Sequence, residues 1–186
     1  MTNKSNLVFI GSSVAILLRK TIEMHPPVDS SGVLQVASGK SNQKLGTYLC
    51  SLGYISPLQL REALVEQQRL MKEGQYWRLG DLFVKKGLIH PQVLVAVLLV
   101  QMTDRLLHQP GLLPQFLGER LVALGVISPM ELAPALIQQT WLRQAGTHVL
   151  LGDLLVQHGV LQTQTLSSVL FFQNQRIAYS INTLVV

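Results

Sequence analysis

The sequence is poor in the residues that build disulfides, metal sites and catalytic centres. Its single cysteine, Cys50, excludes an intramolecular disulfide and a cysteine-rich zinc site. None of the five histidines belongs to a cluster with the spacing of metal ligands. The sequence also has no nucleophile elbow, no paired catalytic carboxylates and no Cys–His arrangement. We therefore expect a protein that is not an enzyme and needs no cofactor or metal, and in which Cys50 is an inert buried thiol.

Charged and aromatic residues are also scarce. They make up 13% and 6% of the chain, against 48% hydrophobic residues, so disorder is not expected over most of the length. The net charge is +5: residues 44–101 hold seven basic and four acidic groups, whereas residues 102–186 hold four of each. Such a modest local excess suits a small anionic ligand. A long nucleic acid would need a denser basic face or more aromatic side chains, so we expect no nucleic-acid partner.

No apolar run is long enough to cross a membrane. The apolar segment from Leu7 to Leu18 is flanked by Lys4 and by Arg19, and it is shorter than the roughly 20 residues that a membrane-spanning helix needs. The small residues of a signal-peptide cleavage site do not follow it. We expect no transmembrane span and a cytoplasmic location. The segment is either a buried strand or short helix that packs on the body, or a peripheral anchor for a membrane or a partner.

The chain contains four copies of one motif, which begin at Lys44, Arg78, Phe116 and Leu150. Each copy has a Leu-Gly pair, an apolar residue three positions after that Gly, a second Gly at a bend and a closing Gln. The starts shift by 34 (44 to 78), 38 (78 to 116) and 34 (116 to 150) residues, which groups the first copy with the second and the third with the fourth. The Leu-Gly pairs are Leu45-Gly46, Leu79-Gly80, Leu117-Gly118 and Leu151-Gly152, the bend glycines are Gly53, Gly87, Gly125 and Gly159, and the closing glutamines are Gln67, Gln101, Gln139 and Gln173.

Each copy has the pattern of a short helix, a glycine turn and a longer helix. In the second copy Leu79, Leu82 and Phe83 share one helical face, and Gly87 follows at the position where a helix favours a left-handed residue. A lone hairpin of this kind cannot bury its apolar stripe, so the hairpins must pack against one another.

The longer helix of each copy begins at a strong start signal. Ser56-Pro57 and Ser128-Pro129 place a capping Ser before a Pro at the first helical position, and His90-Pro91 holds the same place in the second copy. Gln59 and Glu131, three residues after each Ser, complete two capping boxes. The sequence therefore predicts a mainly α fold of four repeated helix-turn-helix hairpins arranged as two pairs, with the structure of the N-terminal segment left open.

The repeats divide the chain into five parts. We expect an N-terminal apolar segment and linker over 1–43, a first repeat pair over 44–101 and a linker over 102–115. A second repeat pair then covers 116–173, and a C-terminal tail covers 174–186.

Three recurring choices need an explanation beyond helix packing. The Gly of each Leu-Gly pair lies early in a short helix, where it costs about 1 kcal/mol relative to Ala, so we expect the close approach of another backbone or of a ligand. Each closing Gln lies on an apolar stripe and either caps the backbone of the neighbouring repeat or contacts a ligand. Asp81, Glu119 and Asp153 follow a Leu-Gly pair and are expected to complement a helix dipole.

Residues 78–101 resemble the cyclic-di-GMP-binding motif of the MshEN-type N-terminal domain of type II secretion and type IV pilus assembly ATPases. That motif has Arg-Leu-Gly, an aliphatic residue, Gly, an aliphatic pair, spaced leucines and a Gln. Residues 44–67 match it with Lys44 in place of the Arg, whereas Phe116 and Leu150 replace the cation in the other two copies. The 186 residues do not include the ATPase domain of that family.

The resemblance implies that two motifs bind one two-fold symmetric cyclic dinucleotide. It assigns the cationic contacts to Lys44 and Arg78 and the polar contacts to Gln67 and Gln101. Arginine suits both a phosphate and the O6/N7 edge of guanine, and glutamine offers a donor and an acceptor to a base edge. The implied site is completed by Gly46, Gly80 and an apolar floor of Leu45, Leu60, Leu64, Leu79, Leu94 and Leu98.

The sequence leaves two functions from different classes open. The first is a non-enzymatic receptor that binds cyclic-di-GMP through residues 44–101 and relays its occupancy to an unidentified protein partner. The alternative is a ligand-free interaction module that docks onto a component of secretion or type IV pilus machinery. Under both functions the second repeat pair, which lacks the cation, serves as a scaffold or as a surface for a partner.

Overall fold

The fold is mainly α, as the sequence predicts. The computed structural model describes residues 4–29, 44–109, 114 and 116–171, and this part of the chain contains helices and no strand. The linker 30–43, Gln173 and the tail 174–186 lie outside the described residues. The helices are α1 (Lys4–Met24), α2 (Leu45–Ser51), α3 (Pro57–Lys72), α4 (Leu79–Lys85), α5 (Pro91–His108), α6 (Leu117–Ala123), α7 (Pro129–Gln144) and α8 (Leu151–Gln157), and residues 163–171 form the helix that follows α8.

The local start and stop signals act where the sequence predicts them. The backbone N–H of Gln59 donates to Oγ of Ser56 at 3.2 Å, and the N–H of Ser56 donates to Oε1 of Gln59 at 2.7 Å. Ser128 and Glu131 form the same capping box at the start of α7. Each short helix ends before a glycine with positive φ, and these angles are 75°, 69°, 70° and 68° at Gly53, Gly87, Gly125 and Gly159. The helix-turn-helix hairpins are therefore built as predicted.

The Gly of each Leu-Gly pair lies beneath a leucine of its own repeat. A methyl group added at Gly46 would lie 2.4 Å from Cδ1 of Leu60, and one added at Gly80 would lie 2.6 Å from Cδ1 of Leu94. Gly118 and Gly152 lie in the same way beneath Leu132 and Leu166. The prediction of a close backbone or ligand was therefore wrong, because the approaching group is the side chain of the longer helix.

Contacts between repeats also run through these glycines. A methyl group added at Gly80 would lie 3.2 Å from Cδ2 of Leu45, and Leu117 and Leu151 approach Gly152 and Gly118 in the same manner. The starts of the first and second repeats therefore lie together, as do the starts of the third and fourth. The second and third repeats also pack directly, through α5 and α7. The arrangement as two separate pairs thus stays a prediction.

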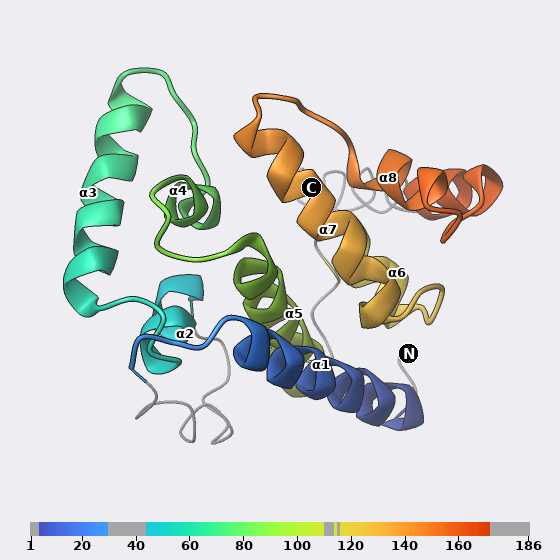
Figure 1. Ribbon diagram of the computed structural model, residues 1–186. Coiled ribbons are helices and arrows are strands. Elements are labelled where there is room, and N and C mark those ends of the chain that lie inside the picture. Colours follow the sequence, from blue (N-terminus) through green and yellow to red (C-terminus); the bar gives the residue numbers. More distant parts are fainter. Residues whose placement is uncertain (1–3, 30–43, 110–113, 115, 172–186) are drawn as a thin grey trace, which may run out of the picture.

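Helix α5 is the centre of the molecule (Figure 1). Its residues Val93 and Val97 belong to an apolar cluster with α2 and α4, whereas Leu99 and Met102 belong to a second cluster with α6, α7 and α8. Helix α5 ends at His108, so the first seven residues of the predicted linker 102–115 are helical. One buried helix is therefore shared by both halves of the chain.

The N-terminal segment forms the 21-residue helix α1, which packs across α5 and also contacts α7. Ile10 and Val14 are buried in the same cluster as Leu99, and Leu18 and Ile22 lie against the other cluster. This matches the interpretation of the segment as an element that packs on the body. Within the residues that the structure describes, no helix is long and apolar enough to cross a membrane.

Candidate functional site

The two predicted cations hold equivalent positions at the starts of α2 and α4. Lys44 and Arg78 are the N-cap residues of these helices, with extended backbones and exposed side chains. Each precedes a leucine of the Leu-Gly pair, and Leu45 of the first repeat lies against Gly80 of the second. The structure therefore brings together the starts of the two repeats that carry a cation.

The predicted apolar floor is only partly accessible. Leu94 is 2% exposed because its side chain fills the space above Gly80, so it cannot contact a ligand in this conformation. The buried glycines Gly46 and Gly80 lie beneath leucine side chains. Leu64 on α3 is 41% exposed and is the most accessible leucine of the set, whereas Leu45, Leu60, Leu79 and Leu98 are half-buried.

Two closing glutamines cap the backbone of the neighbouring repeat. Nε2 of Gln67 donates to the carbonyl oxygen of Trp77 at 2.8 Å, and Nε2 of Gln139 donates to that of Val149 at 2.8 Å. Trp77 and Val149 immediately precede the next copy of the motif. The structural alternative therefore accounts for these two residues. Gln101 is half-buried on α5, and Gln173 lies outside the described residues.

Replacing either capping glutamine by alanine is expected to lower the free energy of unfolding by about 1 kcal/mol, because a backbone carbonyl loses its donor. Gln67→Ala and Gln139→Ala should have similar effects in urea denaturation followed by circular dichroism. The exposed neighbour Gln68 provides the control, and Gln68→Ala should be neutral. A stable Gln67→Ala protein beside a destabilised Gln139→Ala protein would contradict a purely structural role for Gln67.

Two acidic residues that were expected to complement helix dipoles are buried in ion pairs between the second and third repeats. Asp81 of α4 is 5% exposed, and its Oδ1 lies 3.2 Å from Nη2 of Arg143 in α7. Glu119 of α6 is 4% exposed, and its Oε1 accepts from Nε of Arg105 in α5 at 2.7 Å. The dipole explanation is therefore incomplete for both, whereas Asp153 is exposed.

The two ion pairs connect equivalent positions crosswise. Asp81 and Glu119 each follow the start of their copy by three residues, and Arg105 and Arg143 each follow the closing Gln by four. The acid of the second repeat thus binds the arginine of the third, and the reverse holds for the other pair. The sequence carries a signal for this, because Met71 and Ile177 occupy the arginine position in the outer copies.

Burial outweighs charge attraction in the pair of Asp81 with Arg143. Burial raises the pKa of Asp81 above its usual value, although Arg143 and Arg78 both act to lower it. Burial likewise lowers the pKa of Arg143, opposed by Asp81 and reinforced by the positive charge of Arg78. Gln144 supports the junction by donating from Nε2 to the carbonyl oxygen of Asp81 at 2.9 Å. Arg78, Asp81 and Arg143 therefore form one electrostatic group.

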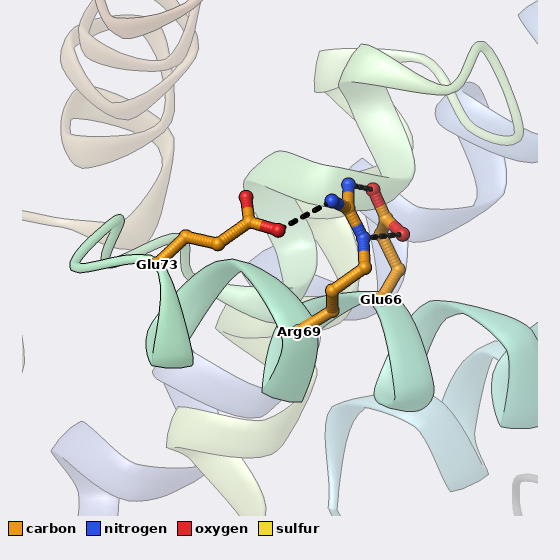
Figure 2. Close-up of polar contacts among 3 residues, drawn as sticks. All are labelled: Glu66, Arg69 and Glu73. Atoms are coloured by element: carbon orange, nitrogen blue, oxygen red, sulfur yellow. Dashed lines mark hydrogen bonds and ion pairs between the residues drawn. The ribbon is translucent and has the colours of Figure 1, made fainter.

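Two other cations of the first two repeats have partners within the chain. Arg69 on α3 lies between two carboxylates, at 2.8 Å from Glu66 and 2.6 Å from Glu73 (Figure 2). Nζ of Lys85 lies 4.0 Å from the centroid of the Trp77 ring.

Burial raises the pKa of the half-buried Cys50 thiol, which fits an inert role. Among the described residues, no group of three or more His, Cys, Asp or Glu could hold a metal ion.

Comparison of the chain with protein-family models, with curated proteins and with solved structures finds no match.

Proposed function

We propose that the protein is a non-enzymatic receptor that binds cyclic-di-GMP through residues 44–101. The observation that carries this proposal is the pair of exposed cations, Lys44 and Arg78, at equivalent positions of two repeats whose starts are in contact. A two-fold symmetric dianion suits two similar half-sites, each with one cation. The half-buried leucines beside them supply apolar surface for the purine rings.

The route from the ligand to a protein partner starts at Arg78. This residue caps α4, and Asp81 of the same helix binds Arg143 of α7. A ligand that engages Arg78 therefore acts one helical turn from the junction between the second and third repeats. In this proposal the third and fourth repeats carry the surface that the partner recognises, and the protein acts in the cytoplasm.

Calorimetric titration with cyclic-di-GMP tests the receptor. GTP, which has the same base but a different shape, and cyclic-di-AMP, which has a similar shape but a different base, are the controls. We expect dissociation constants on the order of 1 μM or tighter for cyclic-di-GMP alone. Arg78→Ala should weaken binding about tenfold or more, because a charge-assisted contact is lost. The control Arg61→Ala removes an exposed arginine of α3 that is not part of the predicted site, and should leave the affinity for cyclic-di-GMP unchanged. A folded protein that does not bind would refute the receptor.

A second function, docking onto a component of secretion or pilus machinery without a ligand, is favoured by the surface of α3. This helix exposes four large apolar side chains while contacting only α2 and α4 extensively. They are Leu58, Leu64, Val65 and Met71. Under this alternative Arg78→Ala would have no effect on partner binding, and Leu58→Ser/Val65→Ser would abolish it.

A further inference from the structure

The crosswise ion pairs create two equivalent sites at the junction of the second and third repeats. One site contains Glu119, Arg105 and the residue that begins the third copy, Phe116. The other contains the ion pair of Asp81 with Arg143, and the charge of Arg78, which begins the second copy, acts on both residues. The acid, the arginine and the first residue of the copy hold the same positions of the motif in both. The two sites can therefore be compared group by group.

The site of Glu119 is complete without a ligand. The guanidinium carbon of Arg105 lies 5.7 Å from the centroid of the Phe116 ring, and Nε of Arg105 donates to the buried carboxylate of Glu119. A cation between a carboxylate and an aromatic face is balanced in charge and has an attractive contact on each side. Phe116 thus contacts at this site the arginine that pairs with Glu119.

The site of Asp81 has an arginine where the other site has the aromatic ring. Arg143 is then paired with the single carboxylate of Asp81, while the positive charge of Arg78 acts on both groups through space. Nη2 of Arg143 lies within 3.2 Å of Asp81, but the buried Nε of Arg143 has no hydrogen-bond partner in the described part of the chain. Two like charges beside one carboxylate cost free energy, and an anion bound between the two guanidinium groups would offset their repulsion.

We propose that Arg78 and Arg143 together form a phosphate-binding subsite at the junction of α4 and α7. Arg78 is exposed and Arg143 retains 18% of its side-chain exposure, so an anion can reach both from solvent. The guanidinium group is suited to this task because its planar set of donors matches two oxygens of a phosphate. The nature of the ligand, a phosphate of cyclic-di-GMP, rests on the proposed function, whereas the anion subsite itself does not. The third repeat is then part of the ligand site.

The test uses the full chain in phosphate-free buffer of low ionic strength, titrated separately with pyrophosphate and with cyclic-di-GMP. The variant Asp81→Asn/Arg143→Gln removes both buried charges at once, so that neither is left unpaired. The matched control is Glu119→Gln/Arg105→Gln, which makes the same change at the equivalent site. We expect about tenfold or greater loss of pyrophosphate affinity in the first variant and none in the control.

Two further variants keep the test decisive if the double variant does not fold. Arg143→Lys keeps a cation beside Asp81 but lacks the planar set of donors, and should also weaken pyrophosphate binding. Arg78→Phe copies the arrangement of Phe116, and should abolish anion binding while raising the melting temperature in anion-free buffer by about 2–4 °C. A wild-type protein that ignores pyrophosphate, or an Arg143→Lys protein that binds it as well as wild type, overturns the subsite.

The two probes separate this subsite from the receptor. If pyrophosphate binding depends on both arginines but cyclic-di-GMP does not bind, the receptor fails and the anion subsite stands. If cyclic-di-GMP binds through Arg78, and neither cyclic-di-GMP nor pyrophosphate binding depends on Arg143, the receptor stands and the subsite is refuted.

Discussion

Phe83→Ala is expected to lower the free energy of unfolding by about 3–5 kcal/mol, because it removes a large side chain that is 0% exposed. Its position in the motif is fully buried in all four repeats, where Leu49, Leu121 and Leu155 are the equivalent residues. Urea denaturation followed by circular dichroism measures the loss. Leu124→Ala, at a leucine that is 62% exposed, is the control and should change stability by no more than about 0.5 kcal/mol.

The same variant tests whether the repeats fold as one unit. Phe83 lies in the cluster of the first two repeats, but α5 supplies side chains to both clusters. We therefore expect a single transition that Phe83→Ala shifts as a whole. The two tryptophans allow the halves to be observed separately, since Trp77 lies in the first half and Trp141 in the second. Different midpoints in Trp77→Phe and Trp141→Phe backgrounds would show two domains instead of one.

Gly53→Ala is expected to be the most damaging glycine substitution, at about 3 kcal/mol or more. The φ of Gly53 is +75°, a conformation that costs other residues about 1–2 kcal/mol. The added methyl group would also lie 1.6 Å from the carbonyl oxygen of Asp29, so the backbone after α1 must move at a further cost of about 1–3 kcal/mol. The N–H of Asp29, which donates to the carbonyl oxygen of Gly53 at 3.2 Å, would lose its partner.

Gly87→Ala is the matched control for that prediction. Gly87 has a φ of +69° in the equivalent turn, but an added methyl group there would meet nothing within 4 Å. It should therefore show the conformational cost alone. Thermal or urea denaturation measures both variants. Equal losses in the free energy of unfolding in Gly53→Ala and Gly87→Ala would contradict the prediction, because the backbone at Asp29 would then move away from residue 53 at no cost in stability.

The features that were predictable from the sequence are those encoded by residues close together in the chain. Ser56 with Gln59 defines a helix start within four residues, and Gly87 defines a helix end at one position. The same signals recur in the other copies of the motif, and for this reason the helix-turn-helix hairpins could be predicted.

The features that were not predictable depend on which helix faces which. The spacing of Leu94 predicts that it lies on an apolar stripe. It does not predict that the side chain is buried over Gly80. For Gly46 the sequence suggested a backbone or a ligand, but the neighbouring group is the side chain of Leu60. For Gln67 two explanations remained until the neighbouring elements were in place. Asp81 and Arg143 are 62 positions apart in the sequence, and no local pattern joins them. The sequence thus named the residues of the candidate site. It did not predict that Leu94 is buried or that Arg143 lies beside Asp81.

The capping glutamines also distinguish the outer connections between repeats from the middle one. Gln67 and Gln139 each donate to a carbonyl ten residues further along the chain. The first connection, between the first and second repeats, and the third, between the third and fourth, therefore have the same length and the same hydrogen bond. The second connection is four residues longer, as the motif shifts of 38 against 34 show. The first and third connections are thus built to one pattern, whereas the second and third repeats are joined by a longer connection and by the crosswise ion pairs. The contact between those two repeats therefore depends on charge, and the contacts within the outer connections depend on an uncharged amide.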